Sequence, residues 1–166
     1  MRNLVIDTCV LIHIVRETVT GKNCIDTISK LDDEPNIIIS VVTKAEMESF
    51  ALQNQWGIKK IEKFEKLLEN ITVIDINHSD TSLLSQYSQI DAYSKGRGVN
   101  KSGNKLSGSA KKMGKNDLWI AATASALDIT LITTDGDFDH LTPHFIDVVK
   151  VKWQGERTTK VFAKAG

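Results

Sequence analysis

The sequence predicts an α/β fold in which a central parallel sheet of four or five strands is flanked by helices. Short runs of apolar, β-branched residues alternate along the chain with segments whose apolar residues recur at helical spacing. This alternation implies right-handed crossovers and a sheet covered on both faces, and therefore a three-layer sandwich. With 166 residues, 41% of them hydrophobic and 25% charged, the chain has the size and composition of one globular domain.

The strands are predicted from apolar runs rich in valine and isoleucine, which are typical of strands buried on both faces. These runs are residues 4–6, 37–42, 71–74, 129–132 and, as a fifth candidate, 145–149. We expect the domain to cover residues 1–150 and the remaining residues, 151–166, to form a tail that either adds a strand or is partly disordered.

The helices are predicted between these runs. Asp7 and Thr8 offer turn and cap chemistry before the first helix, and Pro35 ends the second because proline cannot continue a helix. Gly57 separates two helices that would otherwise be continuous. The expected helical segments are residues 10–15, 24–31, 43–55, 58–69, 80–93 and 117–126.

Charge and cysteine content exclude several classes of protein. The 21 basic residues balance the 21 acidic ones, so the whole molecule is not an obvious polyanion binder. Cys9 and Cys24 lack the spacing of metal ligands, which argues against a zinc ribbon or a disulfide scaffold and suits a reducing compartment. The apolar start of the chain is interrupted by polar residues and is too short to cross a bilayer. We expect a soluble, cytoplasmic protein that does not associate with membranes.

One segment, residues 94–116, stands apart as a basic insertion. It contains five glycines and no acidic residue. Because a segment so rich in glycine and serine has little apolar surface to bury, it is predicted to be mobile. Three interpretations stay open: it holds RNA phosphates, it contacts an acidic partner protein, or it is a solvated linker. Its basic residues are Lys95, Arg97, Lys101, Lys105, Lys111, Lys112 and Lys115.

Four carboxylates fall at equivalent places in the predicted fold. Asp7 follows the first strand and Asp135 follows the fourth, while Glu46 and Asp117 lie in the first turns of helices. In a parallel sheet, strand carboxyl ends and helix amino ends meet at one edge, where ligands bind. The sequence therefore predicts one acidic site.

Such a cluster needs a cation. Two like charges about 4 Å apart repel by roughly 4 kcal/mol at an effective dielectric of 20. Oxygen ligands without cysteine or paired histidine favour Mg²⁺ or Mn²⁺ over zinc. One or two such ions could activate water for phosphodiester cleavage.

Each carboxylate also has a purely structural interpretation. Asp7 suits a helix cap, and Asp135 suits a solvated turn with Gly136 and Asp137. The segment from Thr43 to Glu46 matches a capping box. Asn116 and Asp117 precede an apolar helix and are residue types that commonly cap one. For Glu46 alone the structural and the metal-binding interpretations are equally good, but four such coincidences at one edge favour a site.

Four segments resemble the ordered motifs of PIN domains. They are VIDTCVLI (residues 5–12), ISVVTKAEM (39–47), NDLWIAATA (116–124) and LITTDGDF (131–138). Among small members the chain is most similar to the VapC-type toxin ribonucleases of type II toxin–antitoxin systems. Two features depart from the family pattern: Cys9 stands where many members have asparagine, and the basic insertion is longer than the usual connection.

The resemblance implies a PIN-like sandwich and a metal-dependent endoribonuclease acting in toxin–antitoxin biology. The implied cofactor is Mg²⁺ or Mn²⁺, and the implied partners are RNA, a small antitoxin and a second copy of the chain. The catalytic residues and metal ligands would be Asp7, Glu46, Asp117 and Asp135. Asp137 would be a further metal ligand, and Thr8 or Thr133 would position a water or a ligand.

Three rival functions were weighed against this one. A receiver-like signalling domain lacks an acceptor aspartate after its third strand. A Toprim-like DNA enzyme would use Glu46, Asp135 and Asp137 but leave Asp7 and Asp117 without a role. A catalytically silent PIN-like scaffold that binds RNA or protein conflicts with the complete set of carboxylates.

Three large side chains are predicted to lie exposed near one helix and to suit a dimer or antitoxin surface. They are Met47, Phe50 and Trp56. Trp119, within the helix that begins near Asp117, is predicted to lie in the core.

Overall fold

The computed structural model describes residues 1–155, which form five strands and six α-helices. All five strands lie in one parallel sheet with the order β3–β2–β1–β4–β5, which confirms the predicted α/β class. The strands are β1 (Asn3–Ile6), β2 (Asn36–Ser40), β3 (Ile71–Ile74), β4 (Thr130–Thr133) and β5 (Val148–Lys150). The helices are α1 (Thr8–Val15), α2 (Val19–Leu31), α3 (Val41–Gln53), α4 (Ile58–Leu68), α5 (Thr81–Ser94) and α6 (Lys115–Leu127).

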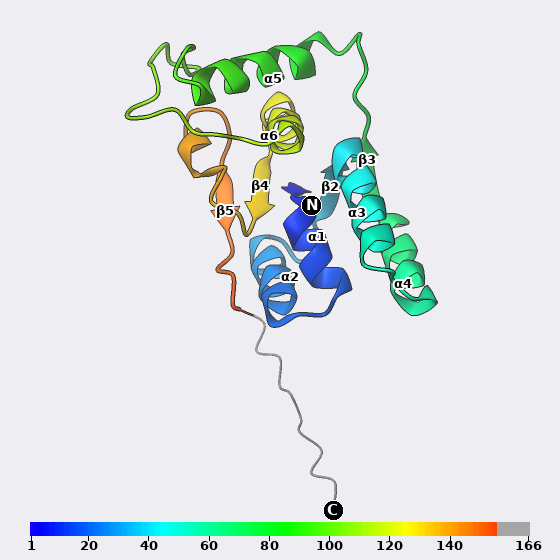
Figure 1. The fold of residues 1–166 in the computed structure, drawn as a ribbon. Coiled ribbons are helices and arrows are strands. Elements are labelled where there is room, and N and C mark those ends of the chain that lie inside the picture. Colours follow the sequence, from blue (N-terminus) through cyan, green and yellow to red (C-terminus); the bar gives the residue numbers. More distant parts are fainter. Residues whose placement is uncertain (156–166) are drawn as a thin grey trace, which may run out of the picture.

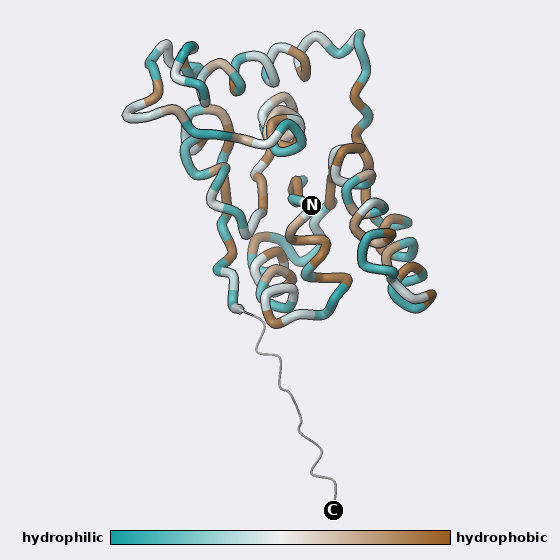
Figure 2. Tube along the Cα trace, in the orientation of Figure 1, coloured by the Kyte–Doolittle hydropathy of each residue, from teal (hydrophilic) through white to brown (hydrophobic). Residues whose placement is uncertain are grey.

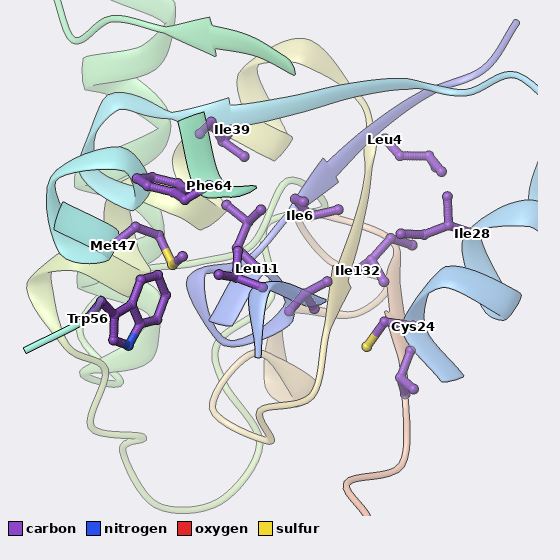
Figure 3. Packing of buried hydrophobic residues seen from close by; sticks show 13 residues of the cluster. Leu4, Ile6, Leu11, Cys24, Ile28, Ile39, Met47, Trp56, Phe64 and Ile132 are labelled. Atoms are coloured by element: carbon purple, nitrogen blue, oxygen red, sulfur yellow. The ribbon is translucent and has the colours of Figure 1, made fainter. Parts of the chain in front are cut away.

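The sheet divides two hydrophobic layers, as expected for strands whose side chains alternate between faces. Leu4 and Ile6 of β1 pack with α1 to α4, whereas Val5 between them packs with α5 and α6. Figure 1 shows α5 and α6 on one side of the sheet and α1 and α2 on the other. Figure 3 shows the first layer, in which Leu11 lies between Ile6 and the aromatic ring of Phe64. The three-layer sandwich is therefore present.

Helix α3 begins earlier than predicted. Ser40, at the end of β2, is its N-cap, and the Ser40 hydroxyl accepts a 3.3 Å hydrogen bond from the amide of Val42. The predicted strand over 37–42 is thus two residues too long, because β-branched residues suit the first turn of this helix as well as a strand. Thr43 is inside the helix, so the capping box with Glu46 is wrong. Glu46 lies in the second turn.

Helices α1, α2 and α6 also start before their predicted positions, α1 at Thr8. Helix α2 begins at Val19, where the Thr18 hydroxyl caps the amide of Gly21 at 3.0 Å. Helix α6 begins at Lys115, after Gly114 as N-cap. Asp117 is therefore in the first turn of α6, as predicted, but neither Asp117 nor Asn116 is the cap residue.

The predicted exposed surface near α3 is wrong. Met47 is fully buried and Trp56 is 8% exposed, because α4 folds back and places Phe64 against them. Phe50 is half-buried and meets Trp56 edge to face, with ring centroids 5.7 Å apart. Trp119 was predicted to be core, but it is only partly buried and packs on Tyr87 of α5 at 4.1 Å.

The connection between α5 and α6, residues 95–114, has a defined path although it is largely hydrophilic or neutral (Figure 2). The amide of Lys111 donates a 2.7 Å hydrogen bond to the carbonyl of Ser94, and the Asn100 side chain bonds to Nδ1 of His144 at 3.0 Å. Leu106 and Met113 pack against the second core layer. Contacts with α5 and the 138–146 segment therefore define the path of this connection, and its mobility stays a prediction.

The chain after β5 continues along α2 as far as it is described. Val151 packs into the first core layer, and the amide of Gln154 donates to the Thr20 hydroxyl at 3.0 Å. Residues 156–166, the larger part of the predicted tail, lie outside the described residues. Within residues 1–155 no helix is both long and apolar enough to span a membrane.

Candidate active site

The strand order reverses between β1 and β4, because β2 and β3 lie on one side of β1 and β4 and β5 on the other. The crevice outside the carboxyl ends of such neighbouring strands is where ligands bind in open α/β sheets. Asp7 follows β1 and Asp135 follows β4, while α3 and α6 bring Glu46 and Asp117 toward the same edge. All four carboxylates act on one another electrostatically, since the other three each raise the pKa of Asp117.

Asp7 is the most deeply buried of the four, with 2% of its surface exposed. Its amide donates to the carbonyl of Ile132 at 3.1 Å, which extends the β1–β4 pairing by one residue. The hydroxyl of Thr133 donates to Asp7 Oδ2 at 2.8 Å. Burial raises the pKa of Asp7 to about 6, although hydrogen bonds from the Thr133 hydroxyl and the Thr8 backbone lower it, and repulsion from Asp135 and Glu46 adds to the rise. Asp7 is the N-cap residue of α1, as its structural interpretation predicted, but its side chain makes no capping hydrogen bond, so the cap position alone does not account for the carboxylate.

Asp117 combines a structural and an electrostatic role. Burial raises its pKa to about 6, followed by repulsion from the other carboxylates, whereas a hydrogen bond from the Gly114 backbone lowers it. That bond folds the carboxylate back over the helix start, so that Oδ2 would lie only 2.8 Å from a Cβ at position 114. Asp117 is not the cap residue of α6, but its contact with the Gly114 backbone is compatible with its place in the acidic cluster.

Glu46 is held by two neutral donors. The Thr8 hydroxyl donates to Glu46 Oε2 at 2.5 Å, and the side-chain amide of Asn116 donates to Oε1 at 2.6 Å. Thr8 was predicted to position a water or a ligand, but here it bonds a carboxylate. The sequence indicates Asn116 as capping chemistry and as the first residue of the 116–124 motif, but not as a partner of Glu46. Its bond to Glu46 joins residues 70 apart, for which the sequence offers no signal.

Asp135 stands at the turn after β4. Its amide donates to the Thr133 hydroxyl at 2.9 Å, and its Oδ1 accepts a 3.0 Å bond from the amide of Asp137. The turn interpretation of this segment is therefore correct, although the charge of Asp135 still acts on Asp7 and Asp117. Asp137 is exposed and lines a neighbouring hollow instead of the main cleft.

The main cleft has a volume of about 640 Å³ and runs between α1, α3 and the start of α6. Its polar end holds Asp7, Glu46 and Asp117, and its other walls are largely apolar. Cys9 also lines it, but burial, with nearby Asp7, raises the pKa of this thiol to about 12. A thiol that stays protonated is a poor nucleophile, which argues against cysteine-based covalent catalysis here. The remaining lining residues are Thr8, Ile12, Val42, Ala45, Ser49, Phe50, Gln53 and Asn116.

The carboxylates suit a hard divalent cation, although they do not form a finished cage. Among residues 1–155, no three histidine, cysteine, aspartate or glutamate side chains are close enough to hold an ion by themselves. All the clustered donors are oxygens, and burial, followed by their mutual repulsion, raises the pKa values of Asp7 and Asp117. Mg²⁺ commonly binds through one or two carboxylates while retaining several waters. The donor set therefore fits a hydrated ion.

Two lysines of the α5–α6 connection lie beside the acidic site. Lys111 and Lys112 line a hollow of about 340 Å³ together with Asp137, Asp139 and His140. Burial lowers the pKa of His140, and the charge of Lys111 contributes in the same direction. Lys95, by contrast, pairs with Asp91 at 2.7 Å on α5. The other basic residues of the connection do not line this hollow.

An acidic cleft at the carboxyl edge of a parallel sheet, on a doubly covered α/β sandwich, defines the class of this protein. Residues 4–142 match the PIN domain family, and the chain belongs to that family. The match includes all four clustered carboxylates. Membership in the PIN domain family argues against the receiver-like and Toprim-like alternatives, which are different families.

Known proteins resemble the chain over most of its length. It is 25% identical over 149 residues to Ribonuclease VapC1 of Haemophilus influenzae strain R2866, which covers 90% of this chain and 94% of that protein. The solved VapBC2 complex of Rickettsia felis, bound to a promoter DNA fragment, superposes with a TM-score of 0.66 at 17% identity, covering 89% of this chain and 98% of that one. VapBC-1 of nontypeable Haemophilus influenzae gives a TM-score of 0.65 at 24% identity, covering 89% and 97%.

Proposed function

We propose that this protein is a divalent-metal-dependent endoribonuclease and the toxin of a type II toxin–antitoxin pair. The observation that carries the proposal is the convergence of Asp7, Glu46, Asp117 and Asp135 at one edge of the sheet, where the first three line the cleft. The similarity to a VapC ribonuclease supports RNA as the substrate. The solved VapBC complexes support a small antitoxin partner, and we extend the proposal to a homodimer.

The clustered residues would have two roles, metal binding and the positioning of a metal ligand. Asp7 and Asp117, whose pKa values lie near 6, would be ionised at neutral pH and would hold Mg²⁺ or Mn²⁺ together with Glu46 and Asp135. Such an ion, when bound, would lower the pKa of a water and stabilise the leaving oxygen of a phosphodiester. Thr133 keeps Asp7 in place through its 2.8 Å hydrogen bond.

The basic connection would hold the substrate. A cluster of carboxylates repels RNA phosphates, so a nearby cationic surface helps binding. Lys111 and Lys112 lie next to the turn that carries Asp135 and Asp137, which favours the phosphate-holding role over that of a solvated linker. Contact with an acidic segment of the antitoxin is the competing role for the same lysines. Because Asp137 lines this hollow and not the acidic cleft, it is the least favoured of the proposed metal ligands.

The test is cleavage of a total-RNA pool by the purified protein in Mg²⁺, in Mn²⁺ and in EDTA. Discrete fragments that require the metal and disappear in Asp7→Asn and Asp117→Asn are expected. Asp33→Asn, an exposed aspartate outside the cleft, is the matched control and should cleave normally. Cleavage that persists in both active-site variants would refute the proposal. If the wild type neither cleaves nor binds metal in calorimetry, the silent-scaffold alternative replaces it.

A further inference from the structure

We propose that Asn116 and Thr8 form a clamp that fixes the carboxylate of Glu46, and that Asn116 is thereby a positioning residue for the metal site. The inference rests on the proposed metal-dependent function and adds a residue to it. Its basis is geometric: each oxygen of Glu46 receives one short hydrogen bond, from a different element on a different side of the cleft.

Without the clamp, the side chain of Glu46 would be free to adopt several rotamers. Glu46 lies in the second turn of α3, on a partly exposed surface, and carries three rotatable side-chain bonds. A glutamate side chain loses much of its rotamer freedom when it is fixed. Thr8, at the start of α1, and Asn116, at the start of α6, fix it in advance of any ligand.

Both donors are neutral, and this distinguishes them from the lysine or arginine that more often pairs with a glutamate. A cationic partner would compete with a metal ion for the carboxylate, whereas an amide or a hydroxyl leaves its charge intact. Each carboxylate oxygen has two acceptor sites, so one hydrogen bond on each still leaves a site for another ligand. The clamp therefore orients Glu46 without neutralising it.

Asn116 also links two of the clustered carboxylates. It directly precedes Asp117 in the first turn of α6, so one helix start supplies both the restraint on Glu46 and the neighbouring carboxylate. The hydrogen bond spans the cleft from α6 to α3, and both residues line it. A movement of either helix would therefore alter the spacing of Glu46 and Asp117 together.

Removal of the clamp should weaken metal binding more than folding. Losing a partner that hydrogen-bonds a metal-ligating side chain typically costs about 10- to 100-fold in metal affinity or activity. Asn116→Ala removes one donor, and Thr8→Val removes the other while Thr8→Ser retains it. Asn70→Ala is the matched control. It also removes a hydrogen bond donated by an exposed side-chain amide, from Asn70 Nδ2 to the Lys66 carbonyl on α4.

The experiment has two readouts. In metal-free protein, the side-chain amide resonances of Asn116 are recorded by NMR with and without Glu46→Gln. A shift on that substitution is expected, and its absence would overturn the clamp whatever the protein's activity. Calorimetric titration with Mn²⁺ then compares the variants. A loss of about 10-fold or more in Asn116→Ala and Thr8→Val, with Thr8→Ser and Asn70→Ala near wild type, is expected.

The outcomes separate the two proposals. Equal Mn²⁺ affinity in wild type and Asn116→Ala would overturn the positioning role while leaving the nuclease proposal intact. A clamp visible by NMR in a wild-type protein that binds no Mn²⁺ would overturn the metal-dependent function and, with it, the role of Asn116 toward the metal. Thermal melts of each variant exclude unfolding as the cause of weak binding.

Discussion

The hydroxyl of Thr133 donates a 2.8 Å hydrogen bond to Asp7 Oδ2 and accepts a 2.9 Å bond from the amide of Asp135. One buried side chain at the end of β4 thus fixes the carboxylate that follows β1 and the start of the turn that carries Asp135. Because β1 and β4 are adjacent paired strands of a parallel sheet, this hydrogen bond joins two residues whose backbones are already held together. The acidic site is built on the sheet at this point, and its other members approach from helices.

Replacement of Thr133 by valine should disturb both the fold and the site. Valine has nearly the same shape but removes one of the hydrogen bonds to the buried Asp7 carboxylate and leaves the Asp135 amide without its acceptor. Unsatisfied buried groups cost about 1–3 kcal/mol each. We expect a lower free energy of unfolding by chemical denaturation and reduced RNA cleavage. Thr133→Ser, which keeps the hydroxyl, should recover most of both, and equal behaviour of the two variants would contradict this role.

Asp7→Asn should stabilise the metal-free protein at neutral pH. The pKa of Asp7 rises from an ordinary 3.8 to about 6 in the folded state, mainly because of burial. The folded protein therefore binds the proton more tightly, and the stability from this group is fully present below about pH 4 and lost as pH rises through about 6. A shift of roughly two units corresponds to about 3 kcal/mol.

The measurement is urea denaturation in EDTA at pH 5 and pH 7.5. The wild type should be less stable at pH 7.5, to which Asp117 contributes in the same direction because its pKa is also raised. Asp7→Asn should show a weaker pH dependence and a higher stability than wild type at pH 7.5. Asp33→Asn is the control, and an unchanged pH dependence in Asp7→Asn would show that Asp7 is not held in a buried, proton-binding state.

Gly21→Ala should destabilise the corner between α1 and α2. A Cβ at Gly21 would lie 2.3 Å from the carbonyl oxygen of His13 and 2.9 Å from the amide nitrogen of Ile14, both of them backbone atoms that cannot rotate away. Overpacking of this kind typically costs about 1–3 kcal/mol. Gly57→Ala is the matched control, because a Cβ there meets nothing within 4 Å. In thermal melts, the unfolding midpoint should fall for Gly21→Ala and stay unchanged for Gly57→Ala.

The fold and the carboxylate set could be predicted because both depend on local patterns. Buried parallel strands are nearly continuous apolar runs, and residues directly after them must lie at the carboxyl edge. Asp7 and Asp135 were placed by this rule alone. The start of α3 was misplaced because Val41 and Val42 suit a strand and a helix equally, and only the hydroxyl of Ser40 decides between them.

Interactions between distant segments could not be predicted. The bond between Asn116 and Glu46 joins two helices whose starts meet only after the sheet has formed. The burial of Met47 and Trp56 depends on how α4 packs back on α3, which periodicity within either helix does not specify. Likewise, the path of residues 95–114 depends on partners such as His144, whereas composition describes a segment only in isolation.

Neutralising the lysines of the basic connection should weaken RNA binding and reduce its dependence on salt. Each phosphate contact on a single strand contributes about −0.7 to the slope of log affinity against log salt. The triple variant of Lys111, Lys112 and Lys115 to alanine should therefore reduce the slope by up to about 2. Binding is measured in an Asp117→Asn background, so that the RNA is not cleaved during titration.

The control for this prediction removes the same charge elsewhere. Alanine at Lys22, Lys59 and Lys66, exposed on α2 and α4, changes the net charge equally but leaves the cleft edge intact. It should alter the salt slope much less, because only cations near the bound phosphates release counterions on binding. Equal slopes for the two triple variants would show that RNA binding depends on overall charge and not on these lysines. Contact with an acidic antitoxin segment would then be the favoured role of the connection.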